Sequence, residues 1–276
     1  MAVRIVTDSA CDLDDAECEK HGIVVVPLSI RFGADEYEDR SELSVEGFYG
    51  LMADRDELPE TAAPSPGKFE AAFRRQAEAG ADAVVCINLS SELSATMAAA
   101  ENAARAIGDD LDVRVVDSKS ITAGLGTMVL LAAEKAAGGA SADEVVALVE
   151  DLRERTRVLG SLDTLENLKK GGRIGGAQAM LGSLLSIKPM IDISTGVVEE
   201  AGKHRTRKKS LQALADKIGE GGTSVEHLAI MHGMAPDIDD MTSLVGDHEY
   251  RLGHIGAVIG THGGPRVIGA CWVEDR

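Results

Sequence analysis

The chain has 276 residues, of which 44% are hydrophobic and only 3% aromatic, and its 46 acidic and 28 basic side chains give a formal net charge of −18. This length accommodates one large or two ordinary domains, with a core of mainly aliphatic side chains. The acidic balance argues against nucleic acid or an anionic membrane as the main partner, because phosphate contacts need clustered Lys and Arg.

The first half of the chain alternates apolar strands with helices. In chain order we expect a strand at 3–7, a helix that begins at an Asp12 cap and stops at Gly22, a strand at 23–28, a hairpin-like or irregular stretch at 29–40, a short helix capped by Ser44, a helix at 66–80, a strand at 83–88, a helix at 94–107, a strand at 113–116, and helices at 123–137 and 142–155. Regular alternation of helices with continuous apolar strands predicts a mostly parallel sheet covered on both faces.

A second unit is expected to begin at residue 157. Its expected elements are a strand at 158–161, a helix at 164–170, a glycine-rich break at 171–176, a helix through Leu181, Leu184 and Leu185, strands at 187–193 and 197–200, a helix at 207–219, a strand at 227–231, a helix at 236–246, and strands at 254–259 and 267–273. The sequence therefore predicts an α/β protein of two lobes that hold a ligand between them. Residues 1–156 would form the lobe with the mostly parallel sheet, and residues 157–276 the lobe with a mixed sheet.

Two stretches rich in small hydroxyl residues stand where a strand or a loop gives way to a helix. They are Thr61–Ser65 and Leu89–Thr96. Hydroxyls and free backbone N–H groups at such a junction suit an anionic or carbonyl oxygen. We therefore expect a site for a carboxylate or phosphate, which Gly171–Gly175 and Thr261–Pro265 could complete. Because Ser and Thr also favour helix capping, both roles stay open for these hydroxyls.

Cysteine usage and hydropathy indicate a cytoplasmic protein. The cysteines form no C-x-x-C pair and fit no zinc spacing, so we expect small buried side chains in a reducing compartment. No signal peptide is recognisable, and no apolar run approaches the 18 residues of a membrane span. The four cysteines are Cys11, Cys18, Cys86 and Cys271.

The chain resembles the DegV family over its whole length and in order. Each motif is weakly specific, whereas their succession is strongly so. The matching segments are Ile5–Ser9, Thr61–Ser65 (T-x-x-P-S), Leu89–Thr96 (L-S-S-x-L-S-x-T), Val116–Ser118 running into Gly124–Gly126, Leu165–Ile174 and Gly260–His262.

The resemblance implies a two-domain α/β protein that binds a long-chain fatty acid. The best understood members of the family are the fatty-acid-binding subunit of a bacterial fatty acid kinase, whose separate ATP-dependent subunit phosphorylates the carboxylate. Carried over by motif, Thr61, Ser94 and His262 would bind the carboxylate, and Arg173 and Arg205 would lie near it or face the kinase. Further contacts are expected at Ser65, Ala95, Thr96 and Gly263. We expect a monomeric lipid-binding subunit with no ATP site, metal or cofactor of its own.

Two positions depart from the family pattern. Ala95 replaces a usual Gly after the serine, which would tighten the site if that position needs a positive φ. Arg266 replaces a glycine in the loop after His262, which puts the geometry of that loop in question. Neither change removes a hydroxyl or the imidazole.

The acyl tail needs an aliphatic slot, which the resemblance places in the C-terminal lobe. Methionine is adaptable and suits a flexible chain. Periodicity alone favours ordinary core for these side chains. The candidates are Met180, Leu181, Leu184, Leu185, Ile187, Met190, Ile191 and Ile193.

Other functions stay open on sequence grounds. A lipid esterase could use Ser94 as nucleophile and His262 as base, with Asp8 or Asp117 orienting the imidazole, although the chain has no G-x-S-x-G elbow. A binder of small phosphorylated metabolites is a further alternative. Gly124-Leu125-Gly126 lacks the rest of a dinucleotide fingerprint and favours close helix–sheet packing. The basic stretch 203–209 is either a solvated helix start or a docking surface.

Overall fold

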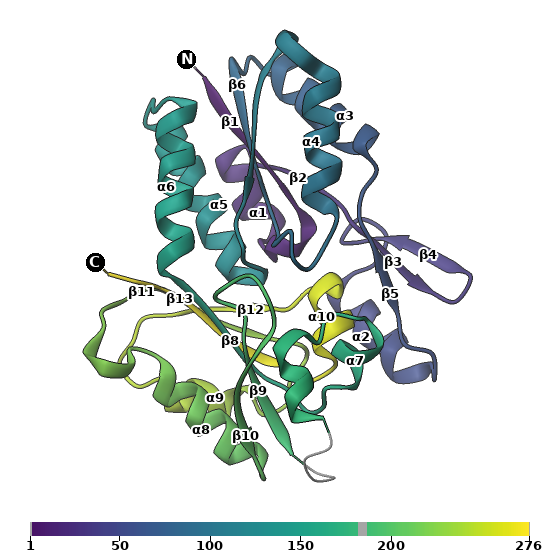
Figure 1. The fold of residues 1–276 in the computed structure, drawn as a ribbon, viewed down its shortest axis with the longest axis vertical. Helices are drawn as coiled ribbons and strands as arrows, with labels where there is room; N and C mark the ends of the chain where they lie inside the picture. The colour runs from purple at the N-terminus through teal and green to yellow at the C-terminus, as the bar shows by residue number, and fades with distance from the viewer. Residues whose placement is uncertain (1, 182–186, 276) are drawn as a thin grey trace.

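Short apolar strands build a parallel sheet in the first part of the chain. The computed structural model of the protein describes residues 2–181 and 187–275. The strand order is β2-β1-β6-β7, and every neighbouring pair is parallel. Helices α3 and α4 cover one face and α5 and α6 the other, as Figure 1 shows. The bounds are β1 (Val3–Asp8), η1 (Ser9–Cys11), α1 (Asp15–His21), β2 (Val24–Val26), α3 (Pro66–Glu78), β6 (Ala83–Asn88), α4 (Thr96–Ile107), η2 (Gly108–Asp110), β7 (Asp112–Asp117), α5 (Thr122–Ala137) and α6 (Ala142–Arg155).

A small antiparallel sheet is inserted between β2 and α3. It has the order β4-β3-β5, and of the two alternatives expected at 29–40, a hairpin-like or an irregular stretch, the structure shows the hairpin. Ser44 caps the helix that follows the hairpin by accepting the N–H of Gly47. The bounds are β3 (Ser29–Phe32), β4 (Asp35–Glu38), α2 (Val45–Asp54) and β5 (Glu60–Ala62).

The second part of the chain forms a mixed sheet with the order β10-β9-β8-β13-β11-β12. Its neighbours are antiparallel except for the parallel pair β11 and β12. Leu211 and Leu214 of α8 pack with Met241 of α9 against one face of this sheet. The bounds are β8 (Thr156–Ser161), α7 (Glu166–Lys170), η3 (Gly175–Met180), β9 (Lys188–Asp192), β10 (Glu199–His204), α8 (Arg207–Lys217), η4 (Glu220–Gly222), β11 (Val225–His232), α9 (Ile238–Leu244), β12 (Arg251–His254), α10 (Ala257–Gly263) and β13 (Ile268–Glu274). The predicted α/β class with a parallel and a mixed sheet is confirmed.

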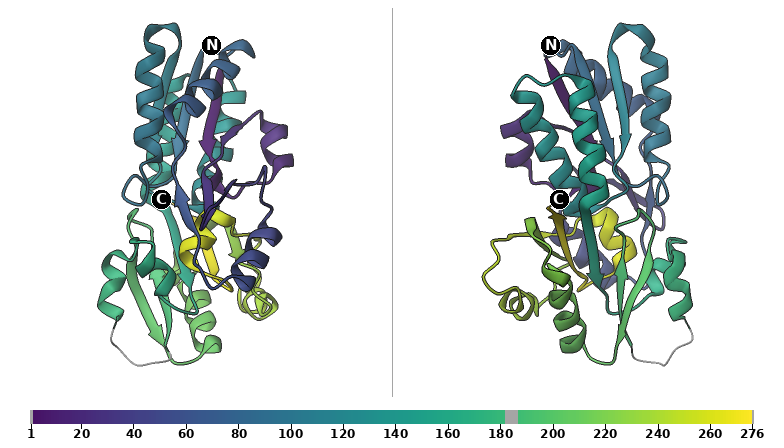
Figure 2. Two further views of the ribbon diagram at one scale, coloured as in Figure 1. Left: turned by 90° about the vertical axis from the view of Figure 1, so that its right-hand side faces the viewer. Right: turned by 60° about the vertical axis from the view of Figure 1, so that its left-hand side comes forward.

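The strand expected at 254–259 is wrong. The structure ends a strand at His254 and begins α10 at Ala257, with Gly256 as its N-cap. The apolar run Ile255–Ile259 is too short to separate a buried strand from a buried helix by periodicity. Tertiary packing decides, because most of α10 is buried between the two sheets, as Figure 2 shows in both views.

The cap expected at Asp12 is also wrong. Asp14 caps α1 and forms a reciprocal capping box with Glu17. Asp12 has a left-handed φ of 50°, and its Oδ1 accepts the N–H of Gly256 at 3.0 Å. The helix expected through Leu181 is not described: Leu184 and Leu185 lie outside the described residues, and Leu181 directly follows η3.

Side chains of the first part of the chain hold the start of α10. Besides Asp12, the hydroxyl of Tyr49 donates to the carbonyl of Ile255 at 3.1 Å. Arg251, at the start of β12, forms an ion pair with Glu17 at 3.0 Å. Helix α10 itself packs against α2, β3, β5 and η1 as well as α7. The beginning of α10 is therefore attached to the N-terminal elements although it lies late in the sequence.

Helix α5 packs closely against its neighbours, as the glycines at 124 and 126 led us to expect. A Cβ at Gly124 would lie 2.6 Å from Cγ2 of Val158, and one at Gly126 would lie 2.6 Å from the carbonyl oxygen of Cys11. These distances are too short for any side chain, so both glycines serve packing.

The two departures from the family pattern, Ala95 and Arg266, differ in the backbone conformation that each residue adopts. Ala95 has a φ of −77°, so an alanine causes no backbone strain there. Arg266 has a φ of 62°, which is left-handed. Its guanidinium lies 3.6 Å from Asp163 and 3.5 Å from Asp237, and these ion pairs oppose the cost of that backbone.

Candidate functional site

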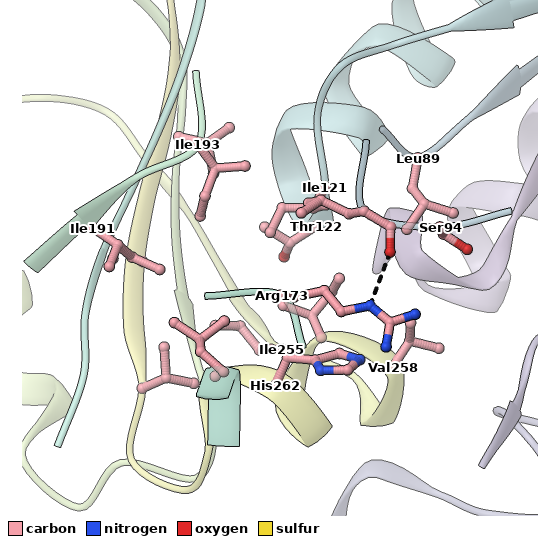
Figure 3. A pocket seen from close by; sticks show the side chains of 18 of the residues that line it. Leu89, Ser94, Ile121, Thr122, Arg173, Ile191, Ile193, Ile255, Val258 and His262 are labelled. Atoms are coloured by element: carbon pink, nitrogen blue, oxygen red, sulfur yellow. Dashed lines mark hydrogen bonds between the residues drawn. The ribbon is translucent and has the colours of Figure 1, made fainter. Parts of the chain in front are cut away.

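A narrow apolar cavity of about 80 Å³ lies between the two sheets. Figure 3 shows polar side chains at one end and Ile191 and Ile193 at the opposite end. Both parts of the chain contribute to it. The lining residues are Leu28, Thr61, Leu89, Leu93, Ser94, Ile121, Thr122, Val158, Leu159, Gly160, Leu168, Arg173, Ile191, Ile193, Ile255, Val258, Ile259, His262, Gly263, Val267, Gly269 and Cys271.

Three hydrogen-bonding residues predicted from the sequence line this one cavity. Thr61 comes from β5, Ser94 from the loop between β6 and α4, and His262 from α10. Oγ1 of Thr61 lies 3.1 Å from Nε2 of His262. Residues 201 positions apart in the sequence therefore form one polar cluster beside an apolar slot.

Ser94 both lines the cavity and organises the start of α4. Its Oγ lies 2.8 Å from Oγ1 of Thr96 and accepts the N–H of Thr96 at 3.2 Å. Thr96 is fully buried and does not line the cavity. Ser94 is therefore tied to the first residue of α4 while it lines the cavity, but the N-cap of that helix is Ala95, and contact of Ser94 with a ligand stays a prediction.

The imidazole of His262 is neutral at physiological pH. Burial lowers its pKa to about 4, and the neighbouring charge of Arg173 acts in the same direction. Its Nδ1 is buried without a hydrogen-bond partner, and a Cβ at Gly171 would lie 2.3 Å from this atom. Nδ1 thus faces bare backbone, and Nε2 is the atom available to Thr61 or a ligand.

We expect the pKa of His262 to be visible in stability as well as in its own titration. Because the folded pKa lies below the unfolded value of about 6.5, the unfolded chain binds more protons between about pH 4 and 6.5. The free energy of unfolding of the wild type should therefore fall relative to His262→Asn as pH drops through this window. Ring NMR signals of His262 should titrate near pH 4, whereas a midpoint near 6.5 would contradict a buried neutral ring.

Arg173 supplies the positive charge at the polar end. Its Nε donates to the carbonyl of Leu93 at 3.1 Å and its Nη1 to the carbonyl of Gly171 at 2.6 Å. Figure 3 shows the guanidinium beside the ring of His262. Because carbonyls already hold two of its nitrogens, the guanidinium is fixed in place rather than free to form a bidentate pair with a ligand carboxylate.

The floor of the cavity contains two glycines on adjacent strands. Gly160 of β8 and Gly269 of β13 are paired directly opposite each other, and both line the cavity. Ile191 of β9 is the partner of Gly160 on the other side. The two missing side chains leave bare backbone in the middle of an apolar wall. This floor was not among the predicted site residues, although a glycine inside an apolar strand indicates close approach of another group.

The expected tail residues divide into two groups. Ile191 and Ile193 line the cavity, whereas Met180 and Met190 are buried elsewhere. Ile187 is half-buried outside the cavity lining, and Leu181 is exposed. The wall is therefore built of isoleucine, valine and leucine rather than methionine, and it includes positions that the sequence did not suggest. These include Leu28, Ile121, Thr122, Val158 and Val258.

Some predicted site residues lie away from the cavity. Ser65 is exposed at the N-cap of α3, and Ala95 is exposed next to Ser94. Arg205 is exposed between β10 and α8. Gly263, by contrast, lines the cavity beside His262.

No hydrolytic triad is assembled around Ser94 in the described residues. The buried carboxyl of Asp8 accepts Nδ2 of Asn88 at 3.0 Å and the N–H of Leu89 at 2.9 Å. Asp117 accepts the hydroxyl of Ser91. Since neither carboxylate contacts His262 and Ser94 bonds to Thr96, the esterase geometry is not supported.

Residues 2–181 and 187–275 contain neither a helix that could cross a membrane nor a cluster of potential metal ligands. No helix in these ranges has the length and hydrophobicity needed to cross a membrane. No cluster of three or more potential metal ligands was found there either.

Comparison with known proteins places the chain among related sequences and structures. The family model described as "Uncharacterised protein, DegV family COG1307" matches residues 2–275. A DegV domain-containing protein from Streptomyces coelicolor is 38% identical over 275 residues, which cover 97% of this chain and 96% of the relative. A solved structure from Thermus thermophilus, described as showing fatty acid binding of a DegV family protein, shares 33% identity with a TM-score of 0.89 and 100% coverage of both chains. A stearic-acid-binding protein from Eubacterium ventriosum shares 26% identity with a TM-score of 0.88, covering 99% of this chain and 98% of that protein.

Proposed function

The chain belongs to the DegV family, and on this premise we propose that it binds a long-chain fatty acid and presents its carboxylate to a separate ATP-dependent kinase subunit. The observation that carries the proposal is the narrow apolar cavity with Thr61, Ser94 and His262 at one end. Fatty acid binding by the Thermus relative and stearic acid binding by the Eubacterium relative support it. A small phosphorylated metabolite would instead need a polar cavity with several anion-binding groups.

The acyl tail would supply most of the affinity. At roughly 0.8 kcal/mol per methylene, a sixteen-carbon chain gives about 12 kcal/mol of gross transfer free energy. Loss of chain and rigid-body freedom offsets much of this. The apolar walls at Val158, Ile191 and Ile193 provide the surface against which such a chain would pack.

The head group would be held by uncharged donors. Thr61 and Ser94 offer hydroxyls in the cavity lining, and Nε2 of the neutral His262 lies 3.1 Å from the hydroxyl of Thr61. Such contacts avoid an unpaired buried charge without forming a tight ion pair. The carboxylate oxygen would then keep a lone pair for attack on the γ-phosphate of ATP, while the kinase subunit supplies ATP and metal.

Arg173, at the site, and Arg205, away from it, would both meet the kinase. Arg173 is fixed beside His262 at the polar end. Arg205 is exposed in the basic stretch before α8, apart from the cavity. In a chain of net charge −18, such groups would be a distinctive contact for an acidic partner.

Identification of a copurifying lipid tests the binding proposal directly. Native mass spectrometry of the purified chain should show one added mass of a long-chain fatty acid, and the extracted lipid should be identifiable by chromatography. A delipidated sample should rebind palmitate or oleate in a one-to-one ratio. A protein that never binds either acid would refute the proposal.

Loss of the Ser94 hydroxyl should weaken binding and phosphorylation together. We expect Ser94→Ala to bind a long-chain fatty acid about tenfold more weakly, because one hydrogen bond to a charged group is worth about 1.5 kcal/mol. Turnover with a bacterial fatty acid kinase subunit should fall at least as much. Ser91→Ala is the matched control, since this exposed hydroxyl lies in the same loop as Ser94 but bonds to Asp117 at the end of β7. Equal turnover in wild type and Ser94→Ala would remove this serine from the site.

A further inference from the structure

Helix α7 and the turn that follows it contact the end of α10 that carries His262. Helix α7 ends at Gly171, and the chain continues to Arg173. Within this segment, 167–173, the contacts with α10 and its surroundings come from Asn167, Gly171 and Arg173. Asn167 and Gly171 do not line the apolar cavity. Any effect of these two residues on a ligand in the cavity would therefore act through their neighbours.

Asn167 fixes the last turn of α10. Its Nδ2 donates to the carbonyl of Thr261 at 3.0 Å, and the residue is only 6% exposed. Carbonyls in the last turn of a helix have no partner within that helix, so a side chain of α7 satisfies this one. A Cβ at Gly264, the C-cap of α10, would lie 3.1 Å from Oδ1 of Asn167, so the amide is enclosed on that side as well. The backbone that precedes His262 is therefore held by α7.

Gly171 fixes the imidazole itself. Its φ of −72° and ψ of −8° suit any residue, so the backbone does not require glycine here. The available space does, because a Cβ would lie 2.3 Å from Nδ1 of His262 and 2.8 Å from Cε1. The Cα hydrogen that takes the place of a side chain points at Nδ1. The ring of His262 therefore lies against bare backbone at the end of α7, in space that a side chain would fill.

Arg173 connects this segment to the loop of Ser94. Its Nη1 donates to the carbonyl of Gly171 at 2.6 Å, and its Nε donates to the carbonyl of Leu93, the residue before Ser94, at 3.1 Å. Figure 3 shows its guanidinium beside the imidazole. Segment 167–173 thus holds the Ser94 loop and the His262 ring in one arrangement.

The surroundings of the two ring nitrogens determine where the neutral imidazole carries its single proton. A proton on Nδ1 would meet the C–H of Gly171, and this buried nitrogen has no hydrogen-bond partner. A proton on Nε2 has an acceptor, because Oγ1 of Thr61 lies 3.1 Å away. Buried N–H groups without an acceptor are rare, so these contacts favour the tautomer protonated at Nε2. The Thr61 hydroxyl, which accepts from the ring, then keeps its own proton for another oxygen.

We propose that Asn167 and Gly171 are positioning residues that hold His262 in the tautomer protonated at Nε2, so that the Thr61 hydroxyl donates to the carboxylate of a bound fatty acid. The presence of that carboxylate rests on the proposed function. In the opposite tautomer, the Thr61 hydroxyl would donate to Nε2 and would present lone pairs to the carboxylate. The position of one proton thus decides whether this end of the cavity attracts or repels an anion.

Nitrogen NMR of the histidine-labelled full chain tests the tautomer without any added ligand. We expect the proton of His262 on Nε2 near neutral pH. Gly171→Ala should push the ring off the backbone, so that one tautomer gives way to a mixture. The pKa of His262 should then rise from about 4 toward its ordinary value of 6.5, because the displaced ring is less buried. Gly176→Ala is the matched control, since its Cβ would make an ordinary contact, 3.7 Å from Cα of Glu199.

A double-mutant cycle with palmitate tests the positioning role. By calorimetry on the delipidated chain, Gly171→Ala should weaken palmitate binding about tenfold, the loss expected for one hydrogen bond to a charged group. In the His262→Ala background the same change should have no effect, because the imidazole that it displaces is gone. Asn167→Leu, which keeps the volume of the side chain but removes the donor, should lose its effect in that background in the same way.

Three results would overturn the proposal. They are a proton on Nδ1 in the wild type, an unchanged ring signal in Gly171→Ala, or equal losses of affinity from Gly171→Ala in both backgrounds, as a general structural role would give. If Gly171→Ala fails to fold, as judged by circular dichroism, Asn167→Leu decides by the same two measurements. A wild type that carries the Nε2 proton but never binds palmitate would refute the proposed function alone, and the tautomer set by segment 167–173 would stand.

Discussion

Replacement of Gly160 by valine is expected to weaken long-chain fatty acid binding by about 100-fold while the protein stays folded. Gly160 and its cross-strand partner Gly269 form the bare floor of the apolar cavity. A valine side chain would occupy space that two or three methylenes of a ligand need, at about 0.8 kcal/mol each. Crowding of the remaining tail against the valine, at the lower end of the range of about 1–3 kcal/mol for overpacking, brings the loss of binding free energy to about 3 kcal/mol, or about 100-fold. Valine suits a strand, so the sheet itself should tolerate the change.

The matched control for this variant is Gly160→Ala. Its Cβ would lie 3.6 Å from Cγ1 of Ile191 and 3.7 Å from Cδ1 of Leu162, which are ordinary contacts. Alanine should therefore change affinity only a few-fold. Calorimetric titration of both delipidated variants with palmitate measures the effect, and circular dichroism checks the fold. Wild-type affinity in Gly160→Val would mean that the tail does not cross this floor.

The second large effect concerns stability rather than binding. Gly126→Ala should lower the free energy of unfolding by about 3 kcal/mol, the upper range for overpacking. The added Cβ would lie 2.6 Å from the carbonyl oxygen of Cys11, and a backbone atom of η1 cannot move aside as a flexible side chain can. Helix α5 would have to shift away from η1 and β1, against which it packs.

Urea denaturation compares this variant with Gly50→Ala. Gly50 lies in the interior of α2, and nothing lies within 4 Å of the position of its Cβ. Alanine there should raise the free energy of unfolding by about 0.5–1 kcal/mol, because glycine is the poorer helix former. The same chemical change should thus act with opposite sign at two helical sites. Equal midpoints for Gly126→Ala and wild type would show that α5 is less tightly packed than its glycines indicate.

Local sequence patterns were sufficient to predict the elements that have a clear apolar run, capping residue or helix-starting proline. The continuous apolar strand at 83–88, the Ser44 cap and the helix from Pro66 are all present in the structure. The errors lie where long-range contacts decide. Asp12 looks like a cap for the nearby helix, but it bonds to Gly256, 244 residues away. The run around Val258 is helical because it is buried between two sheets, which no local pattern records.

The candidate site was predicted from a family resemblance more than from periodicity. Spacing alone does not bring Thr61, Ser94 and His262 to one cavity, as the fold does. Their role in carboxylate binding stays a prediction. The glycine floor could have been suspected from Gly160 and Gly269 in apolar strands, but only strand register shows that they are neighbours.

The attachment of α10 to the N-terminal elements determines what would stay together if the two sheets separated. Tyr49 and Asp12 hold the beginning of this helix, and Thr61 contacts its other end. The imidazole of His262 would therefore move together with the hydroxyls of Tyr49 and Thr61. Strands β8 and β13, which carry Gly160 and Gly269, would move away from the acyl tail. During lipid exchange, the contacts between the acyl tail and these two strands would then break first, and the contacts of the head group would break last.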